Sequence, residues 1–488
     1  MIYAIAPSRL ADGDLWVGTD DGLIWRTRDE GRHWTNVTPA ALTPWSKVGI
    51  LDTSHFDAET AYAAVDRHRL DDFKPYVYRT HDGGKSWQLT ASGIPDGSFV
   101  NAVREDPVRR GLLYAGTEKG VYVSFDDGDH WQSLQANLPV TSVRDLDVHG
   151  DGVVIATHGR AFWVLDDVTP LRQLDARVES ASAWLFAPAT AVRLRSVAFT
   201  GTPMPRDEPA APNPPNGALI DYVLKSGARQ PVTLEIRDAQ GALVRRYSSA
   251  DAPPKADPAK LTVTPDWVKV PSTLSAAPGH HRFVWPLRYP PPKADNPYAD
   301  SVWAPPGRYT LVLEVDGARL TQPLTVVPDP RVSLPPQAYI EQFALARRIE
   351  EESVKVAAAA AEADGLIDAL GERRQGADSA IATAIEALQA RAVDLSGAIL
   401  PKDPQPRWWL TPRSVSSLRF LAGALNRLAT AVDDSDGAPS PDAVAGFEKL
   451  QTTLVATLGA WEALKAKDLA ALNARLRKAG VAEIAAKP

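Results

Sequence analysis

A motif, Ser/Thr-x-Asp-x-Gly-x-x-Trp, occurs three times in the first 131 residues and constrains the fold more than any other feature of the sequence. Its aspartates lie 53 and then 44 positions apart, a spacing that fits repeats of four strands each. Asp at a tight turn accepts hydrogen bonds from backbone N–H groups, Gly supplies the positive φ of the turn, and Trp buries its indole on the hairpin. We therefore predict a structural role for all the motif residues: Thr27, Asp29, Gly31, Trp34, Thr80, Asp82, Gly84, Trp87, Ser124, Asp126, Gly128 and Trp131.

Each motif follows a similar pair of strands, such as LWVGTDDG with LIWRT and LYAGTEKG with VYVS. The second copy carries an insertion, RHRLDDFKP, and a fourth unit, VRDLDVHGDGVVIATHGRAFWVLDD, keeps the strands without the motif. Short strands with turn signals at this period are typical of β-propeller blades. The sequence therefore predicts a partial propeller of about four blades over residues 1–175.

The motifs resemble the Asp boxes (BNR repeats) of sialidases, sortilin-type receptors and tandem-propeller xyloglucan hydrolases. The segments ATHGRAFWVLDD, PPNGALIDYVL, HRFVWPLRYPPP and PPGRYTLVLEVDG resemble the carboxy-terminal part of large secreted bacterial proteins described as sortilin-like or as "BNR-repeat glycosyl hydrolase". This resemblance covers most of the chain. It implies a periplasmic or extracellular location and a propeller that binds a peptide, protein or glycan.

This chain differs from the relatives at the amino terminus. The relatives usually have a signal peptide and one or two complete propellers, whereas MIYAIAPSRLADGDLW reads as a strand and lacks the basic and apolar regions of a signal peptide. Four blades are at the low end for a closed ring. We therefore expect a fragment, a split gene product, or a chain that self-associates or pairs with a separately encoded propeller half, since an unpaired blade edge is prone to association.

Residues 176–214 are expected to form a connecting segment that ends in the proline-rich stretch TGTPMPRDEPAAPNPPNG. From 215 to 328, alternating apolar and polar residues with a turn before each strand predict an immunoglobulin-like β-sandwich. Trp285 and Tyr309 are expected in its core or at its rim, with sugar stacking as the less favoured role.

Residues 329–488 become rich in Ala, Leu, Glu and Lys/Arg with helical periodicity, which predicts an antiparallel helical bundle. We expect Gly371, Gly437 and Gly480 to end helices and the Trp408–Trp409 pair to act as a hydrophobic staple. The expected helices cover 337–370, 376–397, 411–433, 441–465 and 467–479. The chain is thus predicted to be mainly β with an α-helical tail.

Two polar clusters are candidates for ligand binding. Asp66, Arg67 and His68 follow one predicted blade strand, and His158 and Arg160 follow another, so both are expected at one mouth of the propeller channel, where ligands bind. The alternative is that His158 and Arg160 join the last blade to the next domain.

Catalytic signatures are weak. The Arg-Ile-Pro tripeptide of sialidases is missing, and the acids of the blade loops occupy turn positions that favour Asp for backbone reasons. The glucan-cleaving relatives place one acid on each of two propellers, so the resemblance implies that this chain alone is inactive. We assign no catalytic residue. The histidines lack metal-binding spacing, DDSDG at 433–437 fails as a calcium loop, and no cofactor motif is present.

The bulk composition excludes several classes of partner. The net charge is −7 without a dense basic block, which argues against nucleic acid, and no apolar run is long enough to insert into a membrane. Cysteine is absent, so disulfides and thiolate sites are excluded. Three functions stay open: an extracytoplasmic binding or scaffold protein, a glycoside hydrolase component that needs a partner propeller, and a split product that serves in assembly.

Overall fold

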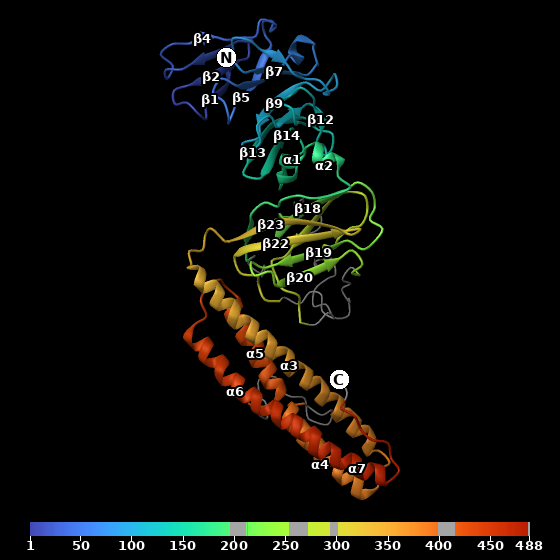
Figure 1. Ribbon diagram of the computed structural model, residues 1–488. Coiled ribbons are helices and arrows are strands. Elements are labelled where there is room, and N and C mark those ends of the chain that lie inside the picture. Colours follow the sequence, from blue (N-terminus) through green and yellow to red (C-terminus); the bar gives the residue numbers. More distant parts are fainter. Residues whose placement is uncertain (196–210, 212, 253–271, 293–300, 399–414, 487–488) are drawn as a thin grey trace. The chain divides into compact units, whose positions relative to one another are not determined.

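The computed structural model describes residues 1–195, 211, 213–252, 272–292, 301–398 and 415–486. These residues divide into two compact units, Met1–Ala189 and Thr190–Pro488. The chain is mainly β over the first 330 residues and helical after them, as the sequence predicted (Figure 1). Trp408 and Trp409 lie outside the described residues.

The first unit contains four consecutive antiparallel sheets, three of four strands and one of three. In each sheet the strands pair in chain order, which is the arrangement of a propeller blade. The strands are β1 Ile2–Pro7, β2 Leu15–Thr19, β3 Ile24–Thr27 and β4 Thr35–Asn36; β5 Lys47–Thr53, β6 Ala61–Asp66, β7 Tyr76–Thr80 and β8 Gln88–Leu89; β9 Val100–Glu105, β10 Leu113–Thr117, β11 Gly120–Ser124 and β12 Gln132–Ser133; β13 Val143–His149, β14 Gly152–Thr157 and β15 Phe162–Leu165.

The four sheets stack face to face through their first strands, because β1 contacts β5, β5 contacts β9 and β9 contacts β13. The small residues Gly18 and Gly116 permit this approach: a Cβ at Gly18 would lie 2.5 Å from a methyl of Val48, and one at Gly116 would lie 2.7 Å from a methyl of Val143. Apolar side chains fill the space between neighbouring sheets. A turn η1 (His68–Leu70), helices α1 (Thr169–Gln173) and α2 (Ala176–Ser180) and strand β16 (Ala183–Leu185) complete this unit.

The second unit begins with two sheets. One has the order β17-β23-β22-β19-β20, and β18 pairs with β21 in the other. Trp285 and Tyr309 are buried here with their ring centroids 5.3 Å apart, edge to face. The immunoglobulin-like topology stays a prediction. The strands are β17 Ala191–Arg193, β18 Ala218–Leu224, β19 Thr233–Arg237, β20 Leu243–Ser248, β21 Gly279–Trp285, β22 Gly307–Val315 and β23 Ala318–Pro328.

The helices follow and bury one apolar core, with α3 and α5 packed side by side (Figure 1). They are α3 Pro336–Arg374, α4 Ser379–Ser396, α5 Leu418–Asp433, α6 Pro441–Ala463, a π-helical segment η4 Leu464–Leu469, and α7 Ala470–Lys478. The expected stop at Gly371 is wrong, because α3 continues to Arg374. Burial of Leu366, Ile367 and Leu370 outweighs the cost of one helical Gly, which is about 1 kcal/mol. Among the described helices, none combines the length and apolarity that a membrane crossing requires.

Candidate functional site

The three Asp-box turns have the same hydrogen bonds. In the first, the Asp29 carboxylate accepts from the Thr27 hydroxyl at 2.9 Å and from the backbone N–H of His33 at 2.8 Å, and the N–H of Gly31 donates to Thr27. The equivalent bonds recur around Asp82 and Asp126. Hydrogen bonds from the His33 side chain and backbone lower the pKa of Asp29 to about 2. The carboxylates of the box aspartates thus use their hydrogen bonds within their own turns.

The box tryptophans differ from the expectation that each folds onto its own hairpin. The indole N–H of Trp87 donates to the Val37 carbonyl at 2.7 Å, and that of Trp131 donates to the Thr90 carbonyl at 2.6 Å. Val37 and Thr90 each follow the last strand of the preceding sheet. We call this contact the back-reaching latch. In the first box, Trp34 instead donates to Gly31 of its own turn at 3.0 Å.

The box glycines belong to the same latch. A Cβ at Gly84 would lie 2.6 Å from the Cβ of Val37, and a Cβ at Gly128 would lie 3.0 Å from the hydroxyl oxygen of Thr90. Gly is therefore required in the second and third boxes for the approach of two sheets as well as for its positive φ.

The predicted cluster at the end of β6 forms a local network. Asp66 is buried, and its carboxylate accepts from the backbone N–H of His68 and pairs with the His68 ring at 2.6 Å. The His68 ring stacks on Phe99 with centroids 5.0 Å apart. Arg67 points to Asp72, 3.4 Å away. Of these three predicted residues, Asp66 lines a pocket of the first unit.

The other predicted pair occupies an exposed turn after β14. The N–H of His158 donates to the Ser142 carbonyl, and the N–H of Arg160 donates to the Thr157 hydroxyl. The Arg160 carbonyl accepts from the indole of Trp163 at 2.8 Å. In the described chain, no hydrogen bond, ion pair or ring contact joins this turn to the Asp66 cluster, so the structure does not bring the two predictions together.

A β-bulge that the sequence did not predict occurs at the same place in all four sheets. The pairing of the first and second strands shifts register between Ile2 and Ala4, Val48 and Ile50, Val100 and Ala102, and Val143 and Asp145. The extra residues are Tyr3, Gly49, Asn101 and Arg144. All four line one pocket of about 260 Å³. Bulges often re-aim side chains next to functional sites.

We call this pocket the bulge pocket. Its wall also contains Lys47, Asp66 and Asp145, so it presents two cations, Lys47 and Arg144, and two carboxylates. The Lys47 ammonium lies 3.8 Å from the centre of the Tyr3 ring. Asn101 fixes the pocket floor, because its amide donates to the Val143 carbonyl at 3.0 Å.

A second hollow of about 440 Å³ continues along the same first strands and shares Tyr3 and Ile50 with the bulge pocket. Asp52 lies in its wall with Arg9 on one side and the backbone N–H of Glu105, which donates at 2.8 Å, on the other. Burial raises the pKa of Asp52, against the opposing effect of Arg104 and of these hydrogen bonds. Together the two hollows form a groove that runs along β1, β5, β9 and β13.

The bulged residues had a signal in the sequence. The four first strands read Ile2-Tyr3-Ala4, Val48-Gly49-Ile50, Val100-Asn101-Ala102 and Val143-Arg144-Asp145, so a non-aliphatic residue follows an aliphatic one each time. Within the described ranges, no three His, Asp or Glu side chains gather in a way that would hold a metal ion.

Comparisons with known proteins find partial similarities, and none of them shows the family of this chain. No protein-family model matches the chain. A stretch of 108 residues, 22% of this chain, is 28% identical to an oligoxyloglucan-reducing end-specific xyloglucanase of Emericella nidulans, and it spans 13% of that protein. Among solved structures, the GH74 xyloglucanase from Xanthomonas campestris is 14% identical with a TM-score of 0.28, over 66% of this chain and 45% of that one. YCF48 bound to D1 peptide is 18% identical with a TM-score of 0.27, over 34% of this chain and 51% of that one. This chain thus spans 13%, 45% and 51% of the lengths of these three proteins. Similarity at this level assigns no activity.

Proposed function

We propose that this chain is an extracytoplasmic binding protein that holds an extended peptide in the groove along β1, β5, β9 and β13. The observation that carries the proposal is the bulge pocket, in which one extra residue from each of four sheets faces the same space. All four sheets share this irregularity. A feature repeated in this way favours a binding role over a local defect.

The chemistry of the groove suits a polypeptide. Each of the four first strands is at the edge of its sheet, so one row of its backbone N–H and C=O groups has no strand partner. Unpaired strand edges bind extended peptides through main-chain hydrogen bonds, while neighbouring pockets select side chains. The wall of the bulge pocket contains two cations and two carboxylates. Arg144 pairs with Glu118, Asp66 with His68 and Asp145 with Arg104, while the Lys47 ammonium lies against the Tyr3 ring. A ligand that carries both signs of charge would complement this wall.

The proposal can be tested with the purified chain and a display library of random peptides, followed by fluorescence anisotropy on the selected sequences. Arg144→Ala removes a half-exposed cation from the pocket, and we expect about tenfold weaker binding. Arg32→Ala is the matched control, because Arg32 is an exposed arginine in the first box turn, outside the groove. Equal affinity of the two variants, or selected peptides that bind both as tightly as the parent chain, would contradict the proposal.

Asp52 favours a second candidate function, a glycoside hydrolase component. A carboxyl group with a raised pKa in a groove is suited to donate a proton to a leaving group, and Asp147 lines the same hollow. The test is release of reducing ends from xyloglucan oligosaccharides by the chain alone and by the chain mixed with a complete propeller of the xyloglucanase class. Activity that survives Asp52→Asn would remove this candidate.

We also propose that the first sheet accepts a further propeller blade, from a second copy or from a separate chain. The indole of Trp34 is 41% exposed, and Tyr3 and Ile5 are more than half exposed on the same sheet. The corresponding residues of the second and third boxes are covered by a neighbouring sheet. Light scattering measures the outcome: a dimer supports pairing between copies, and a monomer leaves a separate chain as the partner to seek.

A further inference from the structure

Neighbouring sheets of the first unit pack through the same positions each time. One, the forward position, lies in the third strand, three residues before the Ser or Thr of the Asp box. It is Ile24, Val77 and Val121 in the first three sheets. The other two, the rear positions, lie in the first strand, directly before the bulged residue and two residues after it. They are Val48 and Leu51 in the second sheet, Val100 and Val103 in the third, and Val143 and Leu146 in the fourth.

These positions meet in the core between sheets. Each forward residue belongs to the same buried apolar cluster as the rear pair of the following sheet. None of these side chains is more than 4% exposed. The chain therefore makes one kind of sheet-to-sheet contact three times.

The fourth sheet leaves its forward position open. The register of β15 on β14 places Phe162 where Val121 lies in the third sheet, and Val164 where Val123 lies. Phe162 is 76% exposed and Val164 is 58% exposed, whereas both valines of the third sheet are buried. The helices α1 and α2, which follow this sheet in the chain, leave these two side chains exposed. We call this surface the forward face of the fourth sheet.

The first sheet leaves its rear positions open. Ile2 and Ile5 occupy them, one directly before the bulged Tyr3 and one two residues after it, at the register of the buried pairs. They are 58% and 65% exposed. Exposed apolar side chains that gather on one face mark interaction sites. The two ends of the array thus present the two halves of a contact that is buried three times within it.

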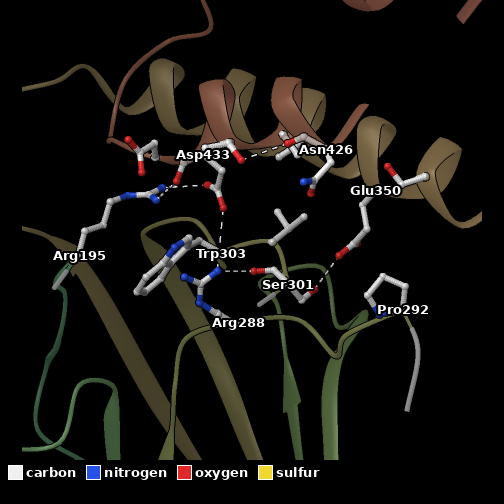
Figure 2. Close-up of a pocket in the computed structure, with 14 residues that line it drawn as sticks. Arg195, Arg288, Pro292, Ser301, Trp303, Glu350, Asn426 and Asp433 are labelled. Carbon is white, nitrogen blue, oxygen red and sulfur yellow. Dashed lines mark hydrogen bonds and ion pairs between the residues drawn. The ribbon is translucent and has the colours of Figure 1, made fainter. Parts of the chain in front are cut away.

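The second unit has a different kind of open surface, the hollow shown in Figure 2. Arg195, which follows β17, donates to the Asp433 carboxylate of α5 at 2.9 Å, and the Ser301 hydroxyl donates to Glu350 of α3 at 2.8 Å. These contacts join the helices to the β part of the same unit. We therefore assign them to packing within that unit.

We propose that the forward face of the fourth sheet binds the first sheet of a second copy of this chain. The contact continues the one that already joins neighbouring sheets, and a head-to-tail contact of this kind closes a ring or extends a filament. Two copies with four sheets each give a ring of eight, within the range of four to eight blades that is usual for propellers. The inference rests on the proposed acceptance of a blade by the first sheet, and it names the partner and the second surface.

The contact between copies lacks one part of the internal contacts. The carbonyls that accept from Trp87 and Trp131 follow the fourth strand of the preceding sheet, and the fourth sheet has three strands in the described chain. Trp34 of a second copy therefore has no equivalent acceptor there. We expect an assembly that dissociates on dilution, by mass action.

The experiment measures the mass of the full chain by analytical ultracentrifugation at about 1–100 μM. Phe162→Asp alters the forward face and Ile2→Asp the rear positions, and each should weaken association at least about tenfold, because an unpaired charge is costly to bury. An equimolar mixture of the two variants should associate again, since each retains the surface that the other has lost. A dimer or a larger assembly with this pattern supports the inference.

Val140→Asp is the matched control, because Val140 is as exposed as Phe162 but lies in the connection between the third and fourth sheets. It should associate like the parent chain, and melting curves establish that all variants are folded. A parent chain that stays monomeric at about 100 μM overturns the inference. Equal association of Phe162→Asp and Val140→Asp also overturns it.

The same variants separate this inference from the proposal for the first sheet. If Ile2→Asp abolishes association, Phe162→Asp keeps it and mixing restores nothing, the copies pair through their first sheets alone. That result overturns the role of the fourth sheet and leaves the first-sheet proposal in place. If Ile2→Asp associates like the parent chain, both fail.

Discussion

Gly93→Ala tests the contact between the second and third sheets. Gly93 has φ +98°, and a Cβ there would lie 2.1 Å from the Trp131 carbonyl oxygen. The backbone at Trp131 would have to retreat by roughly an ångström, because non-bonded contacts that close do not occur in packed proteins. Two hydrogen bonds depend on its present position: Trp131 N–H to the Ser92 carbonyl at 2.8 Å and the indole N–H to the Thr90 carbonyl at 2.6 Å.

The expected loss in the free energy of unfolding has three contributions. A left-handed conformation costs Ala about 1–2 kcal/mol, partly offset by a gain of about 0.5 kcal/mol through the unfolded chain. The two hydrogen bonds contribute about 1 kcal/mol each, and more if a buried carbonyl stays unsatisfied. We therefore expect Gly93→Ala to lower the free energy of unfolding by about 3–5 kcal/mol, or the Tm of this unit by roughly 6–20 °C.

Gly150→Ala is the matched control, since Gly150 also has a positive φ (+58°) but a Cβ there would meet nothing within 4 Å. It should cost about 1 kcal/mol. Urea unfolding, with hydrogen exchange followed by mass spectrometry across residues 88–131, measures the stability and its location. If the two variants lose the same stability, or if exchange near Trp131 is unchanged in Gly93→Ala, the steric reasoning is refuted.

Three further outcomes are expected. Trp87→Phe and Trp131→Phe should each lower the free energy of unfolding by about 1–2 kcal/mol through loss of the back-reaching latch, whereas Trp34→Phe should change it by less than about 0.5 kcal/mol, as measured by urea denaturation. The Ser86 hydroxyl and N–H lower the pKa of Asp82 to about 2. Because this folded-state pKa is below the unfolded value, the contribution of Asp82 is present above about pH 4 and is lost as the pH falls towards 2; Asp82→Asn should remove that part of the acid dependence in a pH series of melting curves. Gly371→Ala should raise stability by about 0.5–1 kcal/mol, since its Cβ would meet a single side-chain atom, 3.4 Å away on Gln389; lower thermal stability would contradict it.

The elements that could be predicted are those determined by residues close together in the sequence. The box turns depend on residues within five positions of one another, and the helices depend on apolar spacing, so both could be read from the chain. The mainly-β body with a helical tail followed from the same patterns. Gly371 shows the limit of prediction from local sequence. The cost of a glycine within a helix could be seen in the sequence, but the burial of Leu370 and its neighbours against α4 could not.

The candidate site was harder to predict because its residues meet through register and stacking. Asp66 was predicted and lies in the bulge pocket, but Arg144 and Asn101 were missed, since a one-residue register shift cannot be seen in a single strand. His158 and Arg160 were selected for their residue types, and their backbone groups serve a turn. Asp52 sits inside an apolar strand, and nothing local indicated that its carboxyl group faces a hollow.

The back-reaching latch gives the array of sheets a direction. The second and third repeats each carry an indole that bonds to the preceding repeat. The carbonyl that accepts such a bond follows the last strand of a repeat; Leu134 occupies that position in the third sheet, where its N–H bonds to Val121 as that of Thr90 does to Val77. A tandem duplication of such a repeat therefore copies both the donor and the acceptor of this hydrogen bond at once. The repeat unit is thus suited to extension by duplication. The fourth repeat lacks the box and therefore lacks the indole donor of this contact.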